Sequence, residues 1–179
     1  MDYKKSLGQH FLIDKNIASK IVRLTDISKN DTVLEIGSGS GILTEKLLQK
    51  CKELFAFEID KNWADFLKKR FSDSPLFVIN EDILKTDFSK IFKNKKIKIV
   101  ANLPYHITSP IIFKIIENRE LFSSITIMIQ DEVAERIVAK PNCKNYGRLT
   151  VKVQRYFDVK KLFTVPPHLF KPRPKVTSS

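Results

Sequence analysis

The sequence predicts a single α/β domain built on a mostly parallel sheet. Apolar, β-branched runs alternate with amphipathic stretches along the chain, and no repeat or low-complexity linker interrupts them. A length of 179 residues is enough for one sizeable core and short for two domains. We therefore expect one compact domain, spanning residues 1–179, with helices on both faces of the sheet.

Each expected element follows from its own stretch of sequence. Strands are expected where short apolar runs are rich in β-branched and aromatic residues, at residues 32–36, 54–59, 76–82, 97–103, 124–130 and 158–165. Helices are expected in the amphipathic stretches, near residues 15–25, 42–51, 61–71, 109–117, 131–139 and 148–156. Ligands bind beyond the carboxyl ends of parallel strands, so the residues that follow each strand are the site candidates.

The composition indicates a basic protein of the cytoplasm. No apolar run is long enough to cross a bilayer, and the first residues lack the apolar centre of a signal peptide, so we expect no membrane contact. Cys51 and Cys143 are far apart and lack metal-ligand spacing, so reduced thiols and no metal are expected.

Lysine and arginine outnumber the acidic residues by 32 to 20, giving a net charge of +12 and a pI near 9.7. This surplus favours a polyanionic partner. Two basic groups are candidates for that contact: Arg148, Lys152 and Arg155 at helical spacing, and Lys171, Arg173 and Lys175 alternating with prolines. The lysine-rich run 93–98 is interpreted as solvated surface.

A glycine-rich loop follows the first long strand. Gly37, Gly39 and Gly41 lead directly into a helix, and glycine lets a backbone turn sharply and approach a ligand closely. A dinucleotide fingerprint would have its third glycine at position 42, where this chain has Ile42. The loop therefore favours a nucleoside-type cofactor, with a simple tight turn as the alternative.

Acidic residues follow the next two strands. Glu58 lies where a carboxylate can accept hydrogen bonds from both hydroxyls of a ribose. Asp82 can accept from an adenine amino group, and Ile83 can lie against the ring. Asp60 opens a helical stretch and is expected to be an N-cap.

The fourth strand ends in Asn-Leu-Pro-Tyr at residues 102–105. The Asn102 side chain offers one oxygen acceptor, and the carbonyl of Leu103 or Pro104 offers a second, while proline fixes the backbone between them. Two acceptors suit a substrate NH2 group, and Tyr105 supplies a flat face for a base drawn out of its stack. The alternative is a turn closed by the same residues without a chemical role.

Together these blocks resemble the ribosomal RNA adenine-N6 dimethyltransferase family, which contains the KsgA type and the erythromycin-resistance methylases. The resemblance runs from Ser6 to Ser178 through SLGQHFLID, LEIGSGSGILT, EID, NEDIL, NLPYHITSPIIFKI, QDEVAERIVAKP, YGRLTV and LFTVPPHLFKPRPKVTSS. The last two blocks are closer to the KsgA type. The resemblance implies a Rossmann-like class I methyltransferase, S-adenosyl-L-methionine as cofactor, and two adjacent adenosines near the 3′ end of small-subunit ribosomal RNA as target.

The family pattern also implies residue roles. Within the N-terminal motif 1–14, Gln9, His10 and Leu12 would lie against the cofactor. The remaining cofactor contacts would be Gly37, Gly39, Glu58, Asp82, Ile83 and Asn102. Asn102, Leu103 and Pro104 would hold the target amine, while Tyr105 and Phe170 would sandwich the flipped adenine.

Three positions and the chain's end depart from the family pattern. His10 stands where many members have Asn, and Ser38 and Ser40 replace a proline and a large apolar residue. The family continues beyond the motif that ends at Ser179 into a last strand and a small helical domain, so we expect a shortened chain. We expect a monomer that acts on the small ribosomal subunit.

Three other functions remain open from the sequence. A non-catalytic RNA-binding assembly factor could keep the same fold, although it would not need two acceptors aimed at an amine. A 23S ribosomal RNA methylase of the erythromycin-resistance type would use the same site. A nicotinamide oxidoreductase is disfavoured by the glycine spacing.

Overall fold

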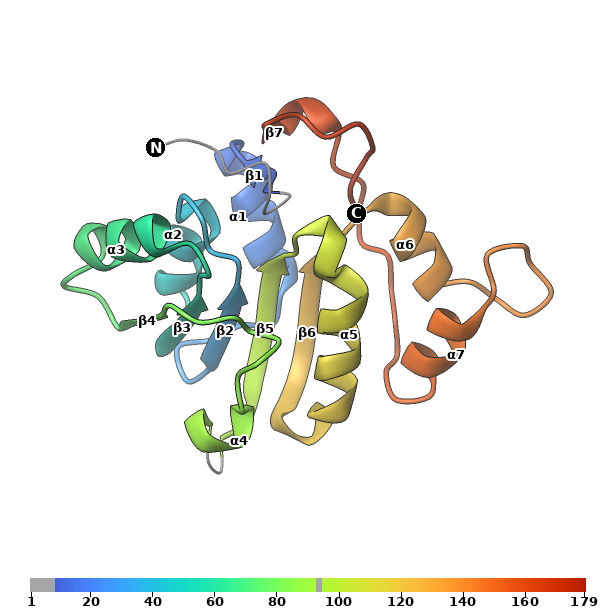
Figure 1. Ribbon diagram of the computed structural model, residues 1–179, viewed down its shortest axis with the longest axis horizontal. Coiled ribbons are helices and arrows are strands. Elements are labelled where there is room, and N and C mark those ends of the chain that lie inside the picture. The colour runs from blue at the N-terminus through green and yellow to red at the C-terminus, as the bar shows by residue number, and fades with distance from the viewer. Residues whose placement is uncertain (1–8, 93–94) are drawn as a thin grey trace.

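The computed structural model describes residues 9–92 and 95–179. Its centre is a five-stranded, wholly parallel sheet in the order β4-β3-β2-β5-β6 (Figure 1). The strands are β2 (Thr32–Ile36), β3 (Glu53–Phe57), β4 (Leu76–Ile79), β5 (Ile97–Asn102) and β6 (Phe122–Met128). Successive strands move outward on one side of β2 from β3 to β4, and on the other side from β5 to β6. The point where this direction reverses lies between β2 and β5.

The helices lie in the stretches where amphipathic periodicity predicts them. They are α1 (Lys15–Leu24), α2 (Ile42–Leu48), α3 (Lys61–Arg70), α5 (Thr108–Glu117), α6 (Asp131–Ile137) and α7 (Arg148–Gln154). The Asp60 carboxylate accepts a hydrogen bond from the Asn62 amide at 2.9 Å, which confirms its expected role as the N-cap of α3. The short helix α4 (Phe88–Ile91) and three 3₁₀ turns, η2 (Tyr105–Ile107), η3 (Arg119–Leu121) and η4 (Pro167–Leu169), were not predicted.

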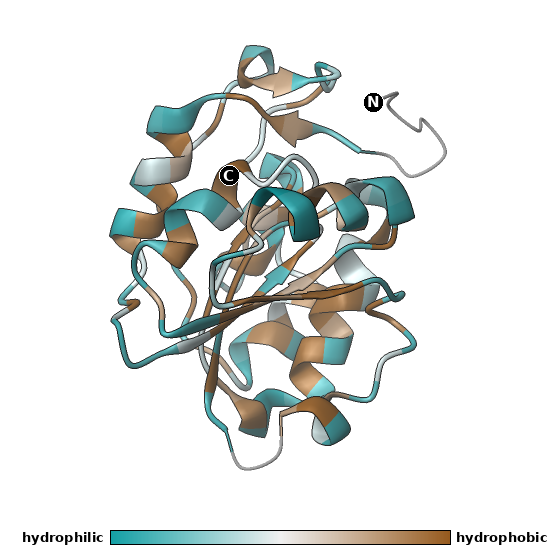
Figure 2. Ribbon diagram, turned by 90° about the vertical axis from the view of Figure 1, so that its left-hand side faces the viewer, coloured by the Kyte–Doolittle hydropathy of each residue, from teal (hydrophilic) through white to brown (hydrophobic). Residues whose placement is uncertain are grey.

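The sheet separates two apolar cores, as alternation along a strand requires. Val33 of β2 belongs to the core shared with α1 and α2, whereas Leu34 and Ile36 belong to the core shared with α5. The view along the sheet in Figure 2 shows apolar strands in the middle with helices on both sides. The predicted parallel α/β architecture is therefore confirmed.

A second, two-stranded sheet lies above the carboxyl end of the main sheet. It joins β1 (Phe11–Leu12) to β7 (Phe170–Lys171) in antiparallel pairing, with Leu12 opposite Phe170 (Figure 1). The Ile13 amide extends the pairing by donating to the Leu169 carbonyl at 2.9 Å. The two ends of the described chain thus meet beside the strand ends where ligands of α/β proteins bind.

The prediction of a strand at residues 158–165 is wrong. These residues form no ladder; only Val165 makes an isolated bridge, to Ser178. A groove separates this segment from β6, so the backbone of residues 158–165 has no adjacent strand with which to form a ladder. Within residues 9–92 and 95–179, no helix combines the length and apolar character needed to cross a bilayer.

Candidate active site

A pocket of about 250 Å³ lies where the strand order reverses, at the carboxyl ends of β2, β3 and β5. Its lining includes most of the predicted site residues: Gln9, His10, Gly37, Glu58, Asp82, Ile83, Asn102, Leu103, Pro104 and Tyr105. This volume is just below the usual range for small-molecule sites, so a nucleoside cofactor would extend through the mouth. Side chains from strand ends far apart in sequence therefore meet at one cavity.

The glycine loop needs its glycines for two different reasons. Gly37 and Gly39 have φ of +73° and +50°, in the left-handed region that other residues rarely adopt. A Cβ at Gly39 would also lie 2.3 Å from the Phe11 ring. Phe11 lines the pocket and packs on Trp63, with ring centroids 5.1 Å apart, so the N-terminal segment closes directly over this loop.

Glu58 binds the glycine loop through one oxygen and the start of α3 through the other. Its carboxylate accepts from the Gly39 amide at 2.8 Å and from the Asp60 amide at 2.9 Å. The side chain is only 3% exposed, and burial raises the pKa of Glu58 despite these bonds. Each carboxylate oxygen can accept a further hydrogen bond, so Glu58 can still bind a diol.

Asp82 and Ile83 lie on the loop after β4. Asp82 accepts from the Leu84 amide at 3.0 Å, which fixes a turn that directs Ile83 into the core shared with α5 and the pocket wall. β4 ends at Ile79, three residues before Asp82, so Asp82 belongs to the following loop and not to the strand predicted at residues 76–82.

Asn102 is the last residue of β5, and its side-chain amide has a fixed orientation. The Nδ2 group donates to the main-chain carbonyl of His10 at 3.0 Å, which leaves Oδ1 as the acceptor end. The Pro104 carbonyl already accepts from the Ile107 amide and the Thr108 hydroxyl. Between the two predicted carbonyls, Leu103 is therefore the better second acceptor.

Tyr105 begins the turn η2 and is half-buried. Its hydroxyl forms a 2.7 Å hydrogen bond with the Ser178 hydroxyl, and its ring lies 5.2 Å from that of His10. Burial raises the pKa of the Tyr105 phenol, so the group is neutral at ordinary pH. The two rings are tilted by 31°, and Tyr105 also lines the pocket, so its ring lies next to both His10 and the cavity.

Leu12 and Phe170 lie outside this pocket lining. They are opposite one another across the β1–β7 pair and only 3% exposed, and both belong to the core shared with α1 and α2. The alternation of a strand explains the difference at the N-terminus: Phe11 faces the glycine loop, so its neighbour Leu12 faces the core. The sequence did not point to Phe11, because in a strand of two residues the pairing with the partner strand decides which side chain faces the loop and which faces the core.

A buried carboxyl group in β2, the strand that leads into the glycine loop, was also not predicted from the sequence. Glu35 of β2 is 1% exposed and accepts from the Thr44 hydroxyl of α2 at 2.7 Å. Burial raises the pKa of Glu35 to about 7, and nearby Glu58 adds to the increase. Its only sequence signal was a carboxylate inside an apolar strand.

The remaining predictions concern surface residues. Arg148, Lys152 and Arg155 are exposed, as are Lys171, Arg173 and Lys175. In the lysine-rich run, residues 93–94 lie outside the described residues; Lys95 and Lys98 form ion pairs with Glu53 and with Asp26 and Asp31. Both cysteines are free, with Cys51 buried and Cys143 exposed.

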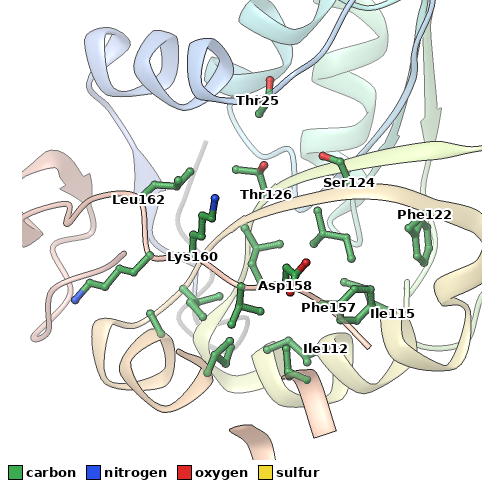
Figure 3. A pocket seen from close by; sticks show the side chains of 18 of the residues that line it. Thr25, Ile112, Ile115, Phe122, Ser124, Thr126, Phe157, Asp158, Lys160 and Leu162 are labelled. Atoms are coloured by element: carbon green, nitrogen blue, oxygen red, sulfur yellow. The ribbon is translucent and has the colours of Figure 1, made fainter. Parts of the chain in front are cut away.

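A larger groove of about 1080 Å³ runs beside β6. Figure 3 shows Phe122, Ser124 and Thr126 of β6 on one side, with Phe157, Asp158, Lys160 and Leu162 contributing from the later segment. Its lining combines apolar residues with charged ones such as Lys96, Asp158 and Lys160, and includes none of the predicted catalytic or cofactor residues.

Comparison with known proteins identifies the family. The sequence pattern of the family described as ribosomal RNA adenine dimethylase matches residues 1–179. Ribosomal RNA small subunit methyltransferase A from Clostridium botulinum (strain Langeland) is 48% identical over 98% of this chain, and the Clostridium perfringens (strain SM101) protein of that name is 47% identical over the same share. The chain spans 65% and 62% of the lengths of these two relatives.

Two solved structures are similar over 94% of this chain. A dimethyladenosine transferase from Plasmodium falciparum is 39% identical with a TM-score of 0.85, and the match covers 61% of that chain. The 23S rRNA methyltransferase ErmE is 29% identical with a TM-score of 0.80 and is covered to 67%. With a family match over its whole length and the predicted strand ends assembled around one pocket, this chain belongs to the ribosomal RNA adenine dimethylase family.

Proposed function

We propose that residues 1–179 are the catalytic domain of an enzyme that transfers methyl groups from S-adenosyl-L-methionine to N6 of two adjacent adenosines near the 3′ end of small-subunit ribosomal RNA. The observation that carries this proposal is the orientation of Asn102. Its Nδ2 is engaged by the His10 carbonyl, so its oxygen is the end available to an incoming amine. The curated relatives, named as small-subunit methyltransferases, support the choice of RNA.

The residues present fit a nucleoside cofactor. Gln9 Oε1 is buried and has no hydrogen-bond partner among the described residues, which is costly unless a bound group donates to it. Glu58 would hold the ribose hydroxyls, with Asp82 and Ile83 at the adenine, while Gly37 allows close backbone approach. Leu12 would contribute indirectly, because its packing in the core holds β1 in place and so positions Phe11 at the pocket.

The chemistry follows from the two acceptors. When bound, the cofactor supplies a methyl group on a positively charged sulfur, and the electron pair of the broken S–C bond returns to that sulfur. Asn102 Oδ1 and the Leu103 carbonyl would accept both N–H bonds of the adenine amine, and this favours the pyramidal nitrogen whose lone pair forms the new N–C bond. The alkylated nitrogen then releases its proton to water without a strong base in the site.

Base recognition would rest on Tyr105, with Phe170 as the second wall. Phe170 is buried, so this role requires its side chain to turn out of the core when RNA binds. The exposed basic residues would contact phosphates. We further propose a cytoplasmic monomer that acts on the small ribosomal subunit.

A non-catalytic assembly factor is the alternative from another functional class. Such a protein would need the basic surface but neither the oriented Asn102 nor the carboxylate at Glu58. The 23S methylase type is favoured less, because the ErmE similarity is at 29% identity and that of the small-subunit relatives is at 47% to 48%.

The test has two parts. Calorimetric titration of this chain with S-adenosyl-L-methionine and with NAD should give specific binding for the first alone. The full-length protein should then convert adenosine to N6,N6-dimethyladenosine in small subunits that lack the modification, as measured by mass spectrometry of the RNA. Cofactor binding without methylation would favour the assembly factor, and methylation of large subunits alone would favour the 23S type.

A further inference from the structure

His10 contacts three separate parts of the candidate site. Its main-chain carbonyl accepts from Asn102 Nδ2 at 3.0 Å, and its ring lies 5.2 Å from the Tyr105 ring at an angle of 31°. Its Nδ1 lies 2.7 Å from the Pro172 carbonyl oxygen. Because a carbonyl oxygen can only accept, Nδ1 must carry the hydrogen in this contact. The side chain is therefore directed at Tyr105 and at the segment after β7.

Lys171 of β7 and two residues of the segment that follows form a strip of cations, which we call the basic strip: Lys171, Arg173 and Lys175. All three are exposed, whereas the intervening Pro172 is half-buried and Pro174 is buried. The prolines thus face inward and the cations outward. The Ser178 hydroxyl, three residues further along, binds the Tyr105 hydroxyl. The strip is consequently held beside the pocket at two points, His10 and Tyr105.

We propose that His10 is a positioning residue whose side chain serves the RNA side of the site and not the cofactor. Its ring supports Tyr105 as the stacking surface for the target base. Its Nδ1–H anchors Pro172, so that the basic strip lies where phosphates flanking that base would pass. This inference rests on the proposed function and replaces the cofactor contact that the family pattern implied for this side chain.

Two substitutions separate the two roles. His10→Asn keeps a donor nitrogen near the position of Nδ1 but removes the ring. His10→Phe keeps a ring against Tyr105 but removes the donor. Both retain the main-chain carbonyl that orients Asn102. His168 provides the matched control, because it is an exposed histidine on η4 in the same C-terminal segment.

The two variants should change different kinetic constants for methylation of small subunits. For His10→Asn we expect kcat to fall roughly three- to tenfold, the scale of one aromatic pair, with KM for the RNA substrate little changed. For His10→Phe we expect KM for the RNA substrate to rise roughly three- to tenfold, the scale of one hydrogen bond, with kcat largely retained. Its KM should also depend less steeply on salt, because fewer phosphate contacts are made.

Cofactor affinity distinguishes this role from the one that the family pattern implies. Calorimetry should give a dissociation constant for S-adenosyl-L-methionine within about twofold of the parent for both variants, and for His168→Asn. A large loss of cofactor affinity, or an equal fall in kcat for both variants with no change in RNA KM, would overturn the proposal. A parent protein without methylation activity would instead refute the proposed function. Thermal unfolding of each variant identifies any that fails to fold. His10→Phe, which has no polar side-chain group, is the variant that tests the cofactor claim, and His10→Ala replaces it in that test if the phenylalanine variant does not fold.

Discussion

The two cavities of this protein differ in a way that size does not reveal. The groove beside β6 is about four times larger than the pocket at the strand ends, about 1080 against 250 Å³. The groove is lined by apolar residues together with charged ones from several elements, while in the smaller pocket Glu58 and Asn102 are each oriented by hydrogen bonds to the surrounding backbone. Oriented polar groups at a topological switch point, and not volume, identify the chemical site.

The groove has a structural origin. β6 is the edge of the main sheet, and residues 177–179 enter only one end of the space beside it. There Ser179 exchanges hydrogen bonds with Ile129 of 2.8 and 2.9 Å, and Ser178 exchanges them with Val165. Below that point the described segment 157–163 runs alongside β6 without pairing to it. Substitutions in the groove should therefore affect packing, and substitutions in the pocket should affect chemistry.

The largest effect is expected for Asn102→Ala. Loss of one preorganised acceptor from the reacting amine should lower the rate of methyl transfer about a hundredfold or more. Thr126→Val in the groove is the matched control and should retain the parental rate, because it changes one atom of a β6 side chain remote from the pocket. A methylation assay on small subunits compares the two, and a near-parental rate for Asn102→Ala would remove the proposed role of this residue.

Glu58→Ala should weaken cofactor binding roughly ten- to a hundredfold, since charge-assisted hydrogen bonds contribute about 1.5 to 3 kcal/mol. RNA affinity should change far less, because the basic surface is untouched. Calorimetry with S-adenosyl-L-methionine and an RNA-binding assay measure the two affinities. Glu53→Ala at the opposite end of β3 is the control. Equal losses of both affinities in Glu58→Ala would contradict the assignment.

Gly39→Ala should disturb the loop by two routes, a left-handed backbone and a contact of 2.3 Å with Phe11. A strained residue costs roughly 1 to 2 kcal/mol, which corresponds to a loss of several degrees in Tm. Gly147→Ala has nothing within 4 Å of the new Cβ and should show little change. Differential scanning calorimetry of both variants tests this, and indistinguishable Tm values would mean that Phe11 does not pack on the loop.

The smallest functional change is expected at Glu35, where the effect is on stability. Its pKa is raised from the ordinary value of 4.5 to about 7 by burial. The folded state therefore binds the proton more tightly, so the stabilising contribution is complete below about pH 4.5 and is lost as the pH rises through 7. Relative to Glu35→Gln, the parent should lose up to roughly 3 kcal/mol of unfolding free energy across that window.

Urea unfolding between pH 5 and 8, followed by fluorescence of Trp63, the only tryptophan, measures this difference. Glu53→Gln is the control, because the pKa of Glu53 is shifted in the opposite direction: hydrogen bonds from Lys95 and Thr32 lower it. The contribution of Glu53 to the unfolding free energy is therefore constant between pH 5 and 8. Parallel stability curves for the parent and Glu35→Gln would show that Glu35 stays ionised in the folded protein. The pKa of Glu58 is also raised, so the unfolding free energy of Glu35→Gln should still depend on pH, although less than that of the parent.

The pocket was more predictable than the groove for a physical reason. Glu58 and Asn102 follow apolar runs, and the carboxyl ends of parallel strands must converge at one edge, so their meeting could be foreseen. Segment 158–165 has the residues of a strand, but strand formation depends on a neighbour that local sequence does not reveal. Phe11 was not predicted beside the loop, and Leu12 lies in the core, because pairing with β7 decides which of the two faces the loop.

A crystal structure of this chain with S-adenosylhomocysteine would show which cavity binds the cofactor. We expect the ligand in the smaller pocket, with ribose hydroxyls within hydrogen-bond distance of Glu58, adenine between Asp82 and Ile83, and sulfur directed toward Asn102. Ligand bound in the groove beside β6, or in the pocket with its ribose away from Glu58, would contradict this expectation.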